Sequence, residues 1–283
     1  MTVLRTLADA CGPSLLDVHA DADHNRSVFT LAGPGSRGAC AAARTLAAAV
    51  ATHVSLAGHT GEHPRFGALD VVPFVSLAGT PDEQAHAVRE ARTFAQWWHD
   101  EYGVPVFLYD DADPAGRDLP HARKHAFVRR DPDVGGAEPH PVLGATAVGA
   151  RRPLVAVNCM LISRDLTVAR RIARAMREKD GGLPGVRALA FLLTEADRTQ
   201  VSMNLADLDR TGVQDAVLQV RALARESRTD VASVEFVGLL PRREYDRCAP
   251  DFRDWAGIDL AMTVEARLGR GPRWMPGDAA PGA

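Results

Sequence analysis

The sequence predicts an α/β (α+β) protein made of two similar halves. In the second half, segments typical of strands and helices follow the order strand, helix, strand, strand, helix, strand, which is the split-βαβ order. The first half follows the same series with its opening strand missing. We therefore expect two similar split-βαβ (ferredoxin-like) subdomains, related by structure because no repeat of individual residues is visible.

Apolar periodicity and turn residues assign the elements of the first half. A polar turn, "DADHN", separates two apolar stretches, which predicts a pair of strands joined by a hairpin. The later stretch "ALDVVPFVSL" is nearly continuously apolar, as expected of a buried strand. The expected elements before residue 80 are a helix over 2–11, strands over 14–20 and 26–33, a helix over 36–55 and a strand within 68–77.

A helix is expected to begin after Thr80. Thr80 is a favourable N-cap, Pro81 suits the first helical position, and Glu83 is placed to close a capping box. Gly103 ends the helix, and the apolar stretch 104–109 follows as a strand.

The second half shows the same two periodicities. The expected strands cover 153–162, 186–193, 200–207 and 231–240, and the expected helices cover 164–179 and 212–227. Between the halves, residues 110–152 lack any period, apart from a possible short helix near 119–127. So long an irregular connection is usually functional or disordered.

We expect an N-terminal subdomain over residues 1–150, a C-terminal subdomain over 151–268 and a disordered tail over 269–283.

Composition limits the classes of function. The formal net charge of -3 favours neither nucleic acid nor a membrane surface as partner. No apolar run approaches the roughly 18 residues of a membrane helix, and the N-terminus lacks a signal-peptide pattern. The four cysteines are far apart without a CxxC pair, which is typical of small buried thiols in a reducing compartment. We therefore expect a soluble cytoplasmic protein.

The stretch "GHTGEHPRFGALDVVPF", residues 58–74, is rich in ionisable side chains just before a buried strand. Within it, His63 is a candidate for proton transfer because histidine titrates near neutral pH, and Glu62 or Asp70 could orient its ring. A solvated loop histidine is the alternative, and this loop alone favours it slightly. A zinc pair of His59 and His63 is less favoured, because that spacing suits a helix and no third ligand is evident nearby.

Three other stretches have both a functional and a plain structural interpretation. Asn25 and Arg26 could bind a small anion, or belong to an ordinary polar turn. "GATAVGAR", residues 144–151, could let backbone amides approach a flat or anionic ligand, or be a linker turn. The alternating Gln200, Ser202 and Asn204 are typical of any half-exposed strand.

Taken together, these stretches resemble the glutamate formimidoyltransferase family, the transferase domain of formimidoyltransferase-cyclodeaminase. The resemblance covers about residues 12 to 265 and follows the family's order of motifs. The motifs are "LLDVHADADHNRSVFTLAG", "HTGEHPRFGALDVVPF", "GVPVFLY", "HPVLGATAVGARRPLVAVN", "QVSMNLAD" and "FVGLLP". Nothing resembling the cyclodeaminase domain follows.

The resemblance implies transfer of a formimino group from N-formimino-L-glutamate to N5 of tetrahydrofolate. It implies two α/β subdomains with the folate in a groove between them, a homodimer, and no metal. His63 matches the catalytic histidine of the family's "GEHPR" motif. Arg26, Arg65 and Arg151, with Asn25, become candidates for binding the substrate carboxylates. The implied folate-binding residues are Gly135, Gly136, His140, Pro141, Gly144, Ala145 and Thr146.

The chain also departs from the family pattern. Family members usually open with a strand followed by "VPNFSEG", and this sequence begins about where their first helix should start. That strand is the one missing from the series above, and as an interior strand its loss would leave backbone groups unpaired. His19 stands where family members often have an acidic residue.

Three hypotheses follow. The first is an active formimidoyltransferase, acting on formiminoglutamate or on a different donor or acceptor. The second is a catalytically impaired folate-binding or subunit-interaction homologue. The third, less favoured, is a metal-dependent amidohydrolase that uses His59 and His63.

Overall fold

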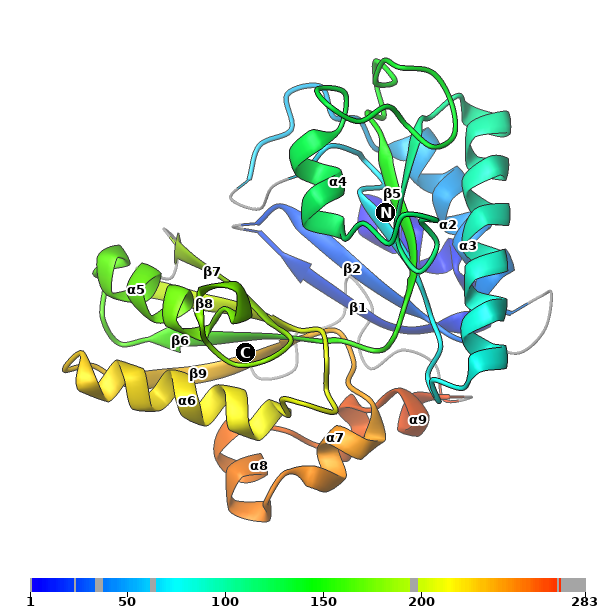
Figure 1. Cartoon of the computed structure of the whole chain (residues 1–283). Helices are drawn as coiled ribbons and strands as arrows, with labels where there is room; N and C mark the ends of the chain where they lie inside the picture. Colours follow the sequence, from blue (N-terminus) through cyan, green and yellow to red (C-terminus); the bar gives the residue numbers. More distant parts are fainter. Residues whose placement is uncertain are drawn as a thin grey trace. The chain divides into compact units, whose positions relative to one another are not determined.

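The computed structural model describes residues 2–22, 24–33, 38–61, 65–193, 198–268 and 270. They form two compact units (Figure 1). The first unit contains residues 2–15 and 31–152, and the second contains residues 16–30 and 153–270. The expected tail, 269–283, lies outside the described residues apart from residue 270.

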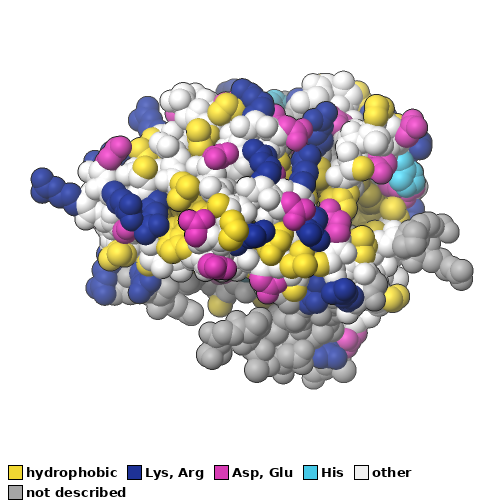
Figure 2. Space-filling model, turned by 90° about the horizontal axis from the view of Figure 1, so that it is seen from below, with side chains coloured by type: hydrophobic (Ala, Val, Ile, Leu, Met, Phe, Trp, Pro, Cys, Tyr) yellow, Lys and Arg dark blue, Asp and Glu magenta, His cyan; other side chains and the backbone are white. Residues whose placement is uncertain are grey.

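The surface carries a mixture of charges. On the face seen in Figure 2, basic and acidic side chains are interspersed, in keeping with the small net charge. Within the described ranges, every helix is too short or too polar to cross a bilayer.

The second unit contains one four-stranded sheet with the order β7-β8-β6-β9, and each neighbouring pair is antiparallel. Helices α5 and α6 pack on one face of it (Figure 1). This is the split-βαβ arrangement, so the prediction for the second half is confirmed. The elements are β6 (Val155–Leu161), α5 (Leu166–Met176), β7 (Val186–Leu193), β8 (Arg198–Leu205), α6 (Val213–Glu226) and β9 (Val231–Val237).

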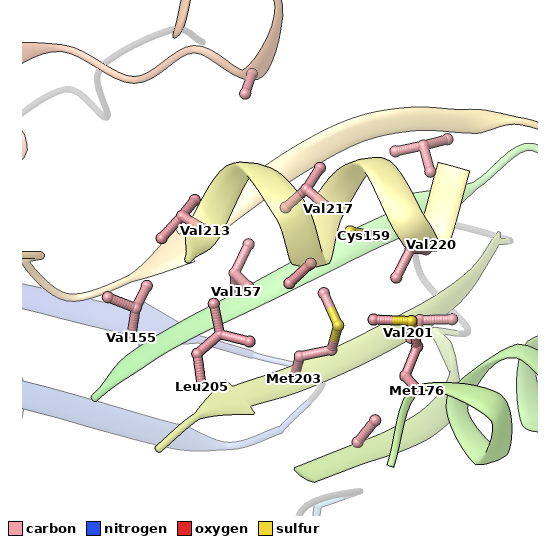
Figure 3. Close-up of a cluster of buried hydrophobic side chains, with 14 of the residues drawn as sticks. Val155, Val157, Cys159, Met176, Val201, Met203, Leu205, Val213, Val217 and Val220 are labelled. Atoms are coloured by element: carbon pink, nitrogen blue, oxygen red, sulfur yellow. The ribbon is translucent and has the colours of Figure 1, made fainter. Parts of the chain in front are cut away.

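The core of this unit lies between the sheet and its helices. Figure 3 shows Val213, Val217 and Val220 of α6 facing side chains of β6 and β8, among them Val157 and Met203. Alternate strand residues fill this layer because successive side chains point to opposite faces. Full burial of one such side chain contributes about 1.5–3 kcal/mol, so this layer is a principal source of the unit's stability.

The predicted hairpin belongs to the second unit by its contacts. Strands β1 (Leu15–Asp21) and β2 (Arg26–Leu31) form a separate two-stranded sheet. His19 lies 3.7 Å from Glu235 of β9, and the His24 ring meets Phe191 of β7 edge-on at 5.1 Å between centroids. The hairpin thus covers part of the face of the four-stranded sheet that bears no helix.

The first unit contains a parallel three-stranded sheet with the order β3-β5-β4. Helix α3 packs on one face of this sheet and α4 lies on the other (Figure 1). Trp98, on α3, is fully buried. The elements are α1 (Val3–Ala10), α2 (Ala39–His53), β3 (Val71–Val75), α3 (Pro81–Tyr102), β4 (Val106–Asp110), α4 (Leu119–His125) and β5 (Thr146–Arg151).

The α/β class and the strands and helices of the first half are confirmed, but its strands divide between two sheets. In the second unit, β6 pairs with both β8 and β9 and so joins the hairpin β7-β8 to the last strand. A strand equivalent to β6 is not among the described elements of the first half. The division therefore falls at the position where the sequence analysis expects an interior strand to be absent.

Residues 146–151 form the central strand β5 rather than a linker turn or ligand loop. The strand was hard to foresee because it is buried on both faces and shows no alternation of polar and apolar residues. Its small residues have a packing role: the ring of Tyr109 lies where a Cβ on Gly149 would be, 2.4 Å from the nearest ring carbon.

Helix α3 begins and ends as predicted, without the expected capping box. The Thr80 hydroxyl accepts the Glu83 amide at 3.3 Å, and Gly103 ends the helix with a left-handed φ of 67°. The Glu83 carboxylate instead accepts from the Ser76 hydroxyl and the Ala78 amide, both at 3.1 Å. It therefore fixes the turn that leads into the helix.

An ion-pair network orders the irregular connection between β4 and β5. The buried Asp113 carboxylate accepts from Arg117 at 2.6 Å and from Arg130 at 3.2 Å. Arg130 also donates to Asp133 at 2.7 Å and to the Leu108 carbonyl at 2.6 Å. The connection is thereby held against β4, which explains how a stretch without sequence periodicity remains ordered.

Short elements complete the described chain. They are α7 (Arg242–Arg247), α8 (Pro250–Ala256), α9 (Val264–Arg267) and the 3-10 turns Gly12–Ser14, Glu178–Asp180 and Leu260–Met262.

Candidate functional site

Two of the predicted site segments, residues 65–70 and residues 135–146, meet in the first unit. The amide of Ala145 donates to the carbonyl oxygen of Phe66 at 2.8 Å. The two segments come from opposite sides of the long α3 in the sequence, so the fold rather than local sequence brings them together.

Glycines make this approach possible. A Cβ on Gly67 would lie 1.8 Å from the carbonyl oxygen of Ala145. Gly144 has a left-handed φ of 72°, and a Cβ there would lie 2.2 Å from the carbonyl oxygen of Phe66. Only residues without a side chain fit at both positions, so the glycines of "RFG" and "LGAT" are required by the packing of the two segments.

Glu62 and His63 lie outside the described residues, so their orienting and catalytic roles stay predictions. His59 and Arg65 stand on either side of these residues in the sequence, and His59 Nδ1 contacts the Arg65 guanidinium. Burial lowers the pKa of His59, and the Arg65 charge lowers it further. Both effects favour the neutral form of the His59 ring.

Asp70 fastens the end of the loop. Its Oδ1 accepts the Phe66 amide at 3.0 Å, and its Oδ2 pairs with Arg123 of α4. Both members of the ion pair are mostly buried. Asp70 was predicted as an orienting group for His63. Its described contacts order the backbone at Phe66, and its effect on His63 stays a prediction.

His140 shapes the turn before β5. Its Nδ1 accepts the amides of Val142 at 3.2 Å and Leu143 at 3.0 Å. The backbone of His140 also exchanges two 2.8 Å hydrogen bonds with that of Gly144. Because Nδ1 is an acceptor here, the ring N–H is on Nε2. Pro141 lies exposed in this turn.

The start of the predicted folate-binding stretch is an exposed glycine pair. Gly135 has a left-handed φ of 97°, and a Cβ there would lie 2.8 Å from Nδ1 of His99. Gly136 has open space around it. The backbone at Gly136 is therefore open to a flat ligand, whereas His99 lies against Gly135, and folate binding here stays a prediction.

The other end of this stretch is inside the protein. Ala145 and Thr146 are fully buried, and the Thr146 hydroxyl accepts the indole N–H of Trp98 at 2.9 Å. The side chain of Thr146 thus joins β5 to α3, and any ligand contact at these residues must come from elsewhere than that hydroxyl.

Arg151 stands at the carboxyl end of β5. Its guanidinium donates to the Arg152 carbonyl at 3.0 Å and is close enough to the buried Tyr109 to influence the pKa of that phenol. Burial raises the pKa of Tyr109 to about 12, although the neighbouring Arg151 charge partly opposes this. The phenol therefore remains protonated at physiological pH.

Asn25 and Arg26 are in the second unit, in the hairpin between β1 and β2. Asn25 takes a left-handed φ of 45° in the turn, and Arg26 begins β2. Asp21 closes this turn by accepting the amide of His24 at 2.8 Å and by pairing with its ring at 2.9 Å. The hydrogen bond to the His24 side chain is the main reason for the lowered pKa of Asp21.

A polar cluster that was not predicted from the sequence lies on the helix-free face of the four-stranded sheet. The amide of Asn158 donates to Glu235 Oε2 at 2.9 Å, and His19 lies 3.7 Å from Glu235 Oε1. Gln200 is fully buried on the same face. The signal was present as alternation in "QVSMN" and as a lone acidic residue in "VEFV", but ordinary half-exposed strands give the same pattern.

The cysteine thiols are poor nucleophiles. Burial raises the pKa of each well above neutrality, to about 12 for Cys11, Cys40 and Cys159 and about 11 for Cys248. Among the residues that the structure describes, no three histidine, cysteine, aspartate or glutamate side chains converge as metal ligands.

The chain matches two family models. The N-terminal subdomain of the formiminotransferase domain matches residues 2–151, and the formiminotransferase domain matches residues 156–252.

Curated relatives agree with these matches. A glutamate formimidoyltransferase of Streptococcus pyogenes serotype M1 is 35% identical over 243 residues, which cover 82% of this chain and 80% of that protein. A glutamate formimidoyltransferase of Thermoplasma acidophilum is 35% identical over 267 residues, covering 90% of this chain and 87% of that protein. The formimidoyltransferase-cyclodeaminase of Sus scrofa is 37% identical over 260 residues, which cover 84% of this chain but 47% of that protein. The chain therefore belongs to the formiminotransferase family of transferase enzymes.

Proposed function

We propose that the protein transfers a formimino group from N-formimino-L-glutamate to N5 of tetrahydrofolate. The main support for this proposal is the contact between segments 65–70 and 135–146. The first segment follows the predicted catalytic histidine, and the second is the predicted folate-binding stretch. The names of the relatives at 35% identity support formimino transfer as the reaction.

In this proposal His63 acts as general base and then general acid. Attack by N5 on the amidine carbon gives a tetrahedral adduct in which the incoming nitrogen carries an extra proton. That proton leaves to the imidazole, which returns it to the departing glutamate nitrogen as the C–N bond breaks. Such proton transfer contributes about 10²–10⁴ in rate, and holding both substrates in one site contributes further.

The binding roles follow the same division. Arg26, Arg65 and Arg151, with Asn25, bind the carboxylates of the donor. The backbone of Gly135, Gly136 and Gly144 lies along the folate, with His140 and Pro141 shaping the turn between them. Tetrahydrofolate serves as co-substrate, and no metal takes part.

We further infer a cytoplasmic enzyme of histidine breakdown or one-carbon metabolism that acts as a homodimer on small molecules, without nucleic acid or membrane. A donor or acceptor other than formiminoglutamate and tetrahydrofolate is the alternative for the same chemistry. A catalytically impaired folate-binding homologue is the second candidate, and the division of the first half into two sheets favours it.

The test is a steady-state assay of purified protein with tetrahydrofolate and N-formimino-L-glutamate, following glutamate release and the new folate product together. Equal amounts of both products support the proposal. Glutamate release without tetrahydrofolate would identify a hydrolase instead. Folate binding without product would identify the impaired homologue.

A further inference from the structure

The helix-free face of the four-stranded sheet carries a row of polar side chains in register. Asn158 of β6 is paired with Glu235 of β9 on one side and with Ser202 of β8 on the other. Their strand neighbours Val157 and Phe236 point the opposite way, into the core beneath the helices. The row is therefore built into the sheet and does not depend on a loop.

Glu235 is held in one orientation within this row. Its Oε2 accepts the Asn158 amide at 2.9 Å, and Asn158 is itself only 4% exposed. His19 approaches Oε1 no closer than 3.7 Å, beyond hydrogen-bond distance. The Glu235 side chain remains 36% exposed. A fixed carboxylate thus keeps acceptor capacity toward solvent.

The same face carries a second acceptor that the described part of the chain leaves unused. The Gln200 side chain is fully buried, its amide nitrogen lies 3.7 Å from the sulfur of Met160, and its Oε1 has no hydrogen-bond partner there. In register, Gln200 is paired with Met160, two residues along β6 from Asn158. An unpartnered buried acceptor is unfavourable, so Gln200 Oε1 adds to the acceptor capacity of Glu235 on this face.

A ligand that presents N–H donors would complement the Glu235 carboxylate. We propose that Glu235, oriented by Asn158, binds a planar N–C–N edge that presents two parallel N–H donors. A carboxylate matches such an edge through two parallel hydrogen bonds, as it matches a guanidinium. In this arrangement Glu235 is the binding residue and Asn158 is a positioning residue.

This inference rests on the proposed function for the identity of the ligand. Both substrates of that reaction carry an N–C–N donor edge: the formimino amidine of the donor, and the amino-pyrimidinone ring of the folate. The chemistry that Glu235 recognises is shared, and binding measurements with each substrate separately distinguish the two sources.

The experiment compares the wild-type protein with Glu235→Gln and Glu235→Ala by calorimetry. Tetrahydrofolate alone, N-formimino-L-glutamate alone and formamidinium chloride alone are the probes. Loss of a charge-assisted bidentate contact should weaken binding of one substrate about 10- to 100-fold. The other substrate should change less than about twofold. Formamidinium should compete with whichever substrate loses affinity.

Two further variants separate recognition from folding. Glu226→Gln removes an exposed carboxylate at the end of α6 and should leave all affinities unchanged. Asn158→Ala should weaken the same substrate as Glu235→Gln but less strongly. The double variant should be no weaker than Glu235→Gln alone, because Asn158 acts only through Glu235. In turnover, the effect should be on KM for that substrate rather than on kcat.

Unchanged affinity for both substrates and for formamidinium in the Glu235 variants would overturn the inference, as would equal weakening by Glu226→Gln. The proposed function fails differently: the wild type would then bind a substrate in a Glu235-dependent way but form no product. Calorimetry measures the effect of the Glu235 variants on affinity whether or not the wild type forms product.

Discussion

Gly67 and Ala145 are so close that a Cβ on Gly67 would lie 1.8 Å from the Ala145 carbonyl oxygen. This contact joins the segment after "GEHPR" to the stretch that leads into β5. Because the obstructing atom belongs to the buried backbone just before β5, the clash cannot be relieved by a side-chain rotation.

Replacing Gly67 with alanine should therefore destabilise the first unit by at least about 1–3 kcal/mol, the usual cost of overpacking. Urea unfolding measures the loss. Gly136→Ala is the matched control, since a Cβ there meets nothing within 4 Å, and its stability should stay within about 0.5 kcal/mol of wild type. Equal stability of the two variants would contradict the packing argument.

His63→Ala should reduce formimino transfer by about 10²–10⁴ in kcat while tetrahydrofolate affinity changes little. The physical reason is that the imidazole moves a proton and makes no binding contact in the proposed mechanism. Turnover and a folate titration on the same preparation check this. His53→Ala removes an exposed histidine at the end of α2 and serves as control. Near wild-type turnover in His63→Ala would remove His63 from the mechanism.

The sequence predicted the local elements well and the tertiary roles less well. The helix starting after Thr80 and ending at Gly103 follows from cap residues, which act within a few positions. Strand β5 was missed because its residues are chosen by contacts with partners that are distant in sequence. The Tyr109 ring packs against Gly149, and the Trp98 indole hydrogen-bonds Thr146. Glu235 was missed because its significance depends on Asn158, 77 positions away, and a single alternating strand does not reveal that partner.

Thr146→Val should lower stability while leaving folate affinity within about twofold. The Thr146 hydroxyl accepts the Trp98 indole N–H at 2.9 Å, and both residues are fully buried. Valine keeps the shape but leaves the indole donor unsatisfied, which costs about 1–3 kcal/mol. Urea unfolding and a folate titration together check this. A large loss of affinity at unchanged stability would mean that the hydroxyl turns to the ligand.

Asp113→Asn should destabilise the protein in a pH-dependent way. Burial alone would raise the pKa of Asp113, but the hydrogen bond from Arg117 and further favourable contacts outweigh it and lower the pKa below 3.8. A lowered pKa in the folded state stabilises it at pH values above the unfolded-state pKa, and this contribution is lost as the pH falls through the folded-state value.

The difference in unfolding free energy between wild type and Asp113→Asn should therefore be largest near pH 7, about 3 kcal/mol for a broken buried pair. It should shrink as the pH is lowered below 3.8. Urea unfolding at steps from pH 7 to pH 3 measures it. Asp254→Asn, an exposed carboxylate of α8, is the control. A difference that does not depend on pH would show that the charge of Asp113 is not what stabilises the connection.

The last prediction concerns the strands of the first half. In the second unit, β6 joins the hairpin β7-β8 to β9 in one sheet, whereas β1 and β2 form only a two-stranded sheet and β3 pairs on one side with β5. A two-stranded sheet is marginal by itself, and an edge strand has a row of unpaired backbone groups. Residues 14–33 and 68–77 should therefore exchange their amide hydrogens faster than residues 186–207, where β7 and β8 are held in a four-stranded sheet.

We expect the transferase activity to be weak or altered for the same reason. Hydrogen exchange followed by mass spectrometry along the chain measures the first part. Exchange in residues 14–33 and 68–77 as slow as in 186–207 would show that these strand edges are protected by other means, such as a partner subunit. Steady-state turnover measures the second part, and a kcat in the usual range of enzymes, about 1–10³ s⁻¹, would contradict it.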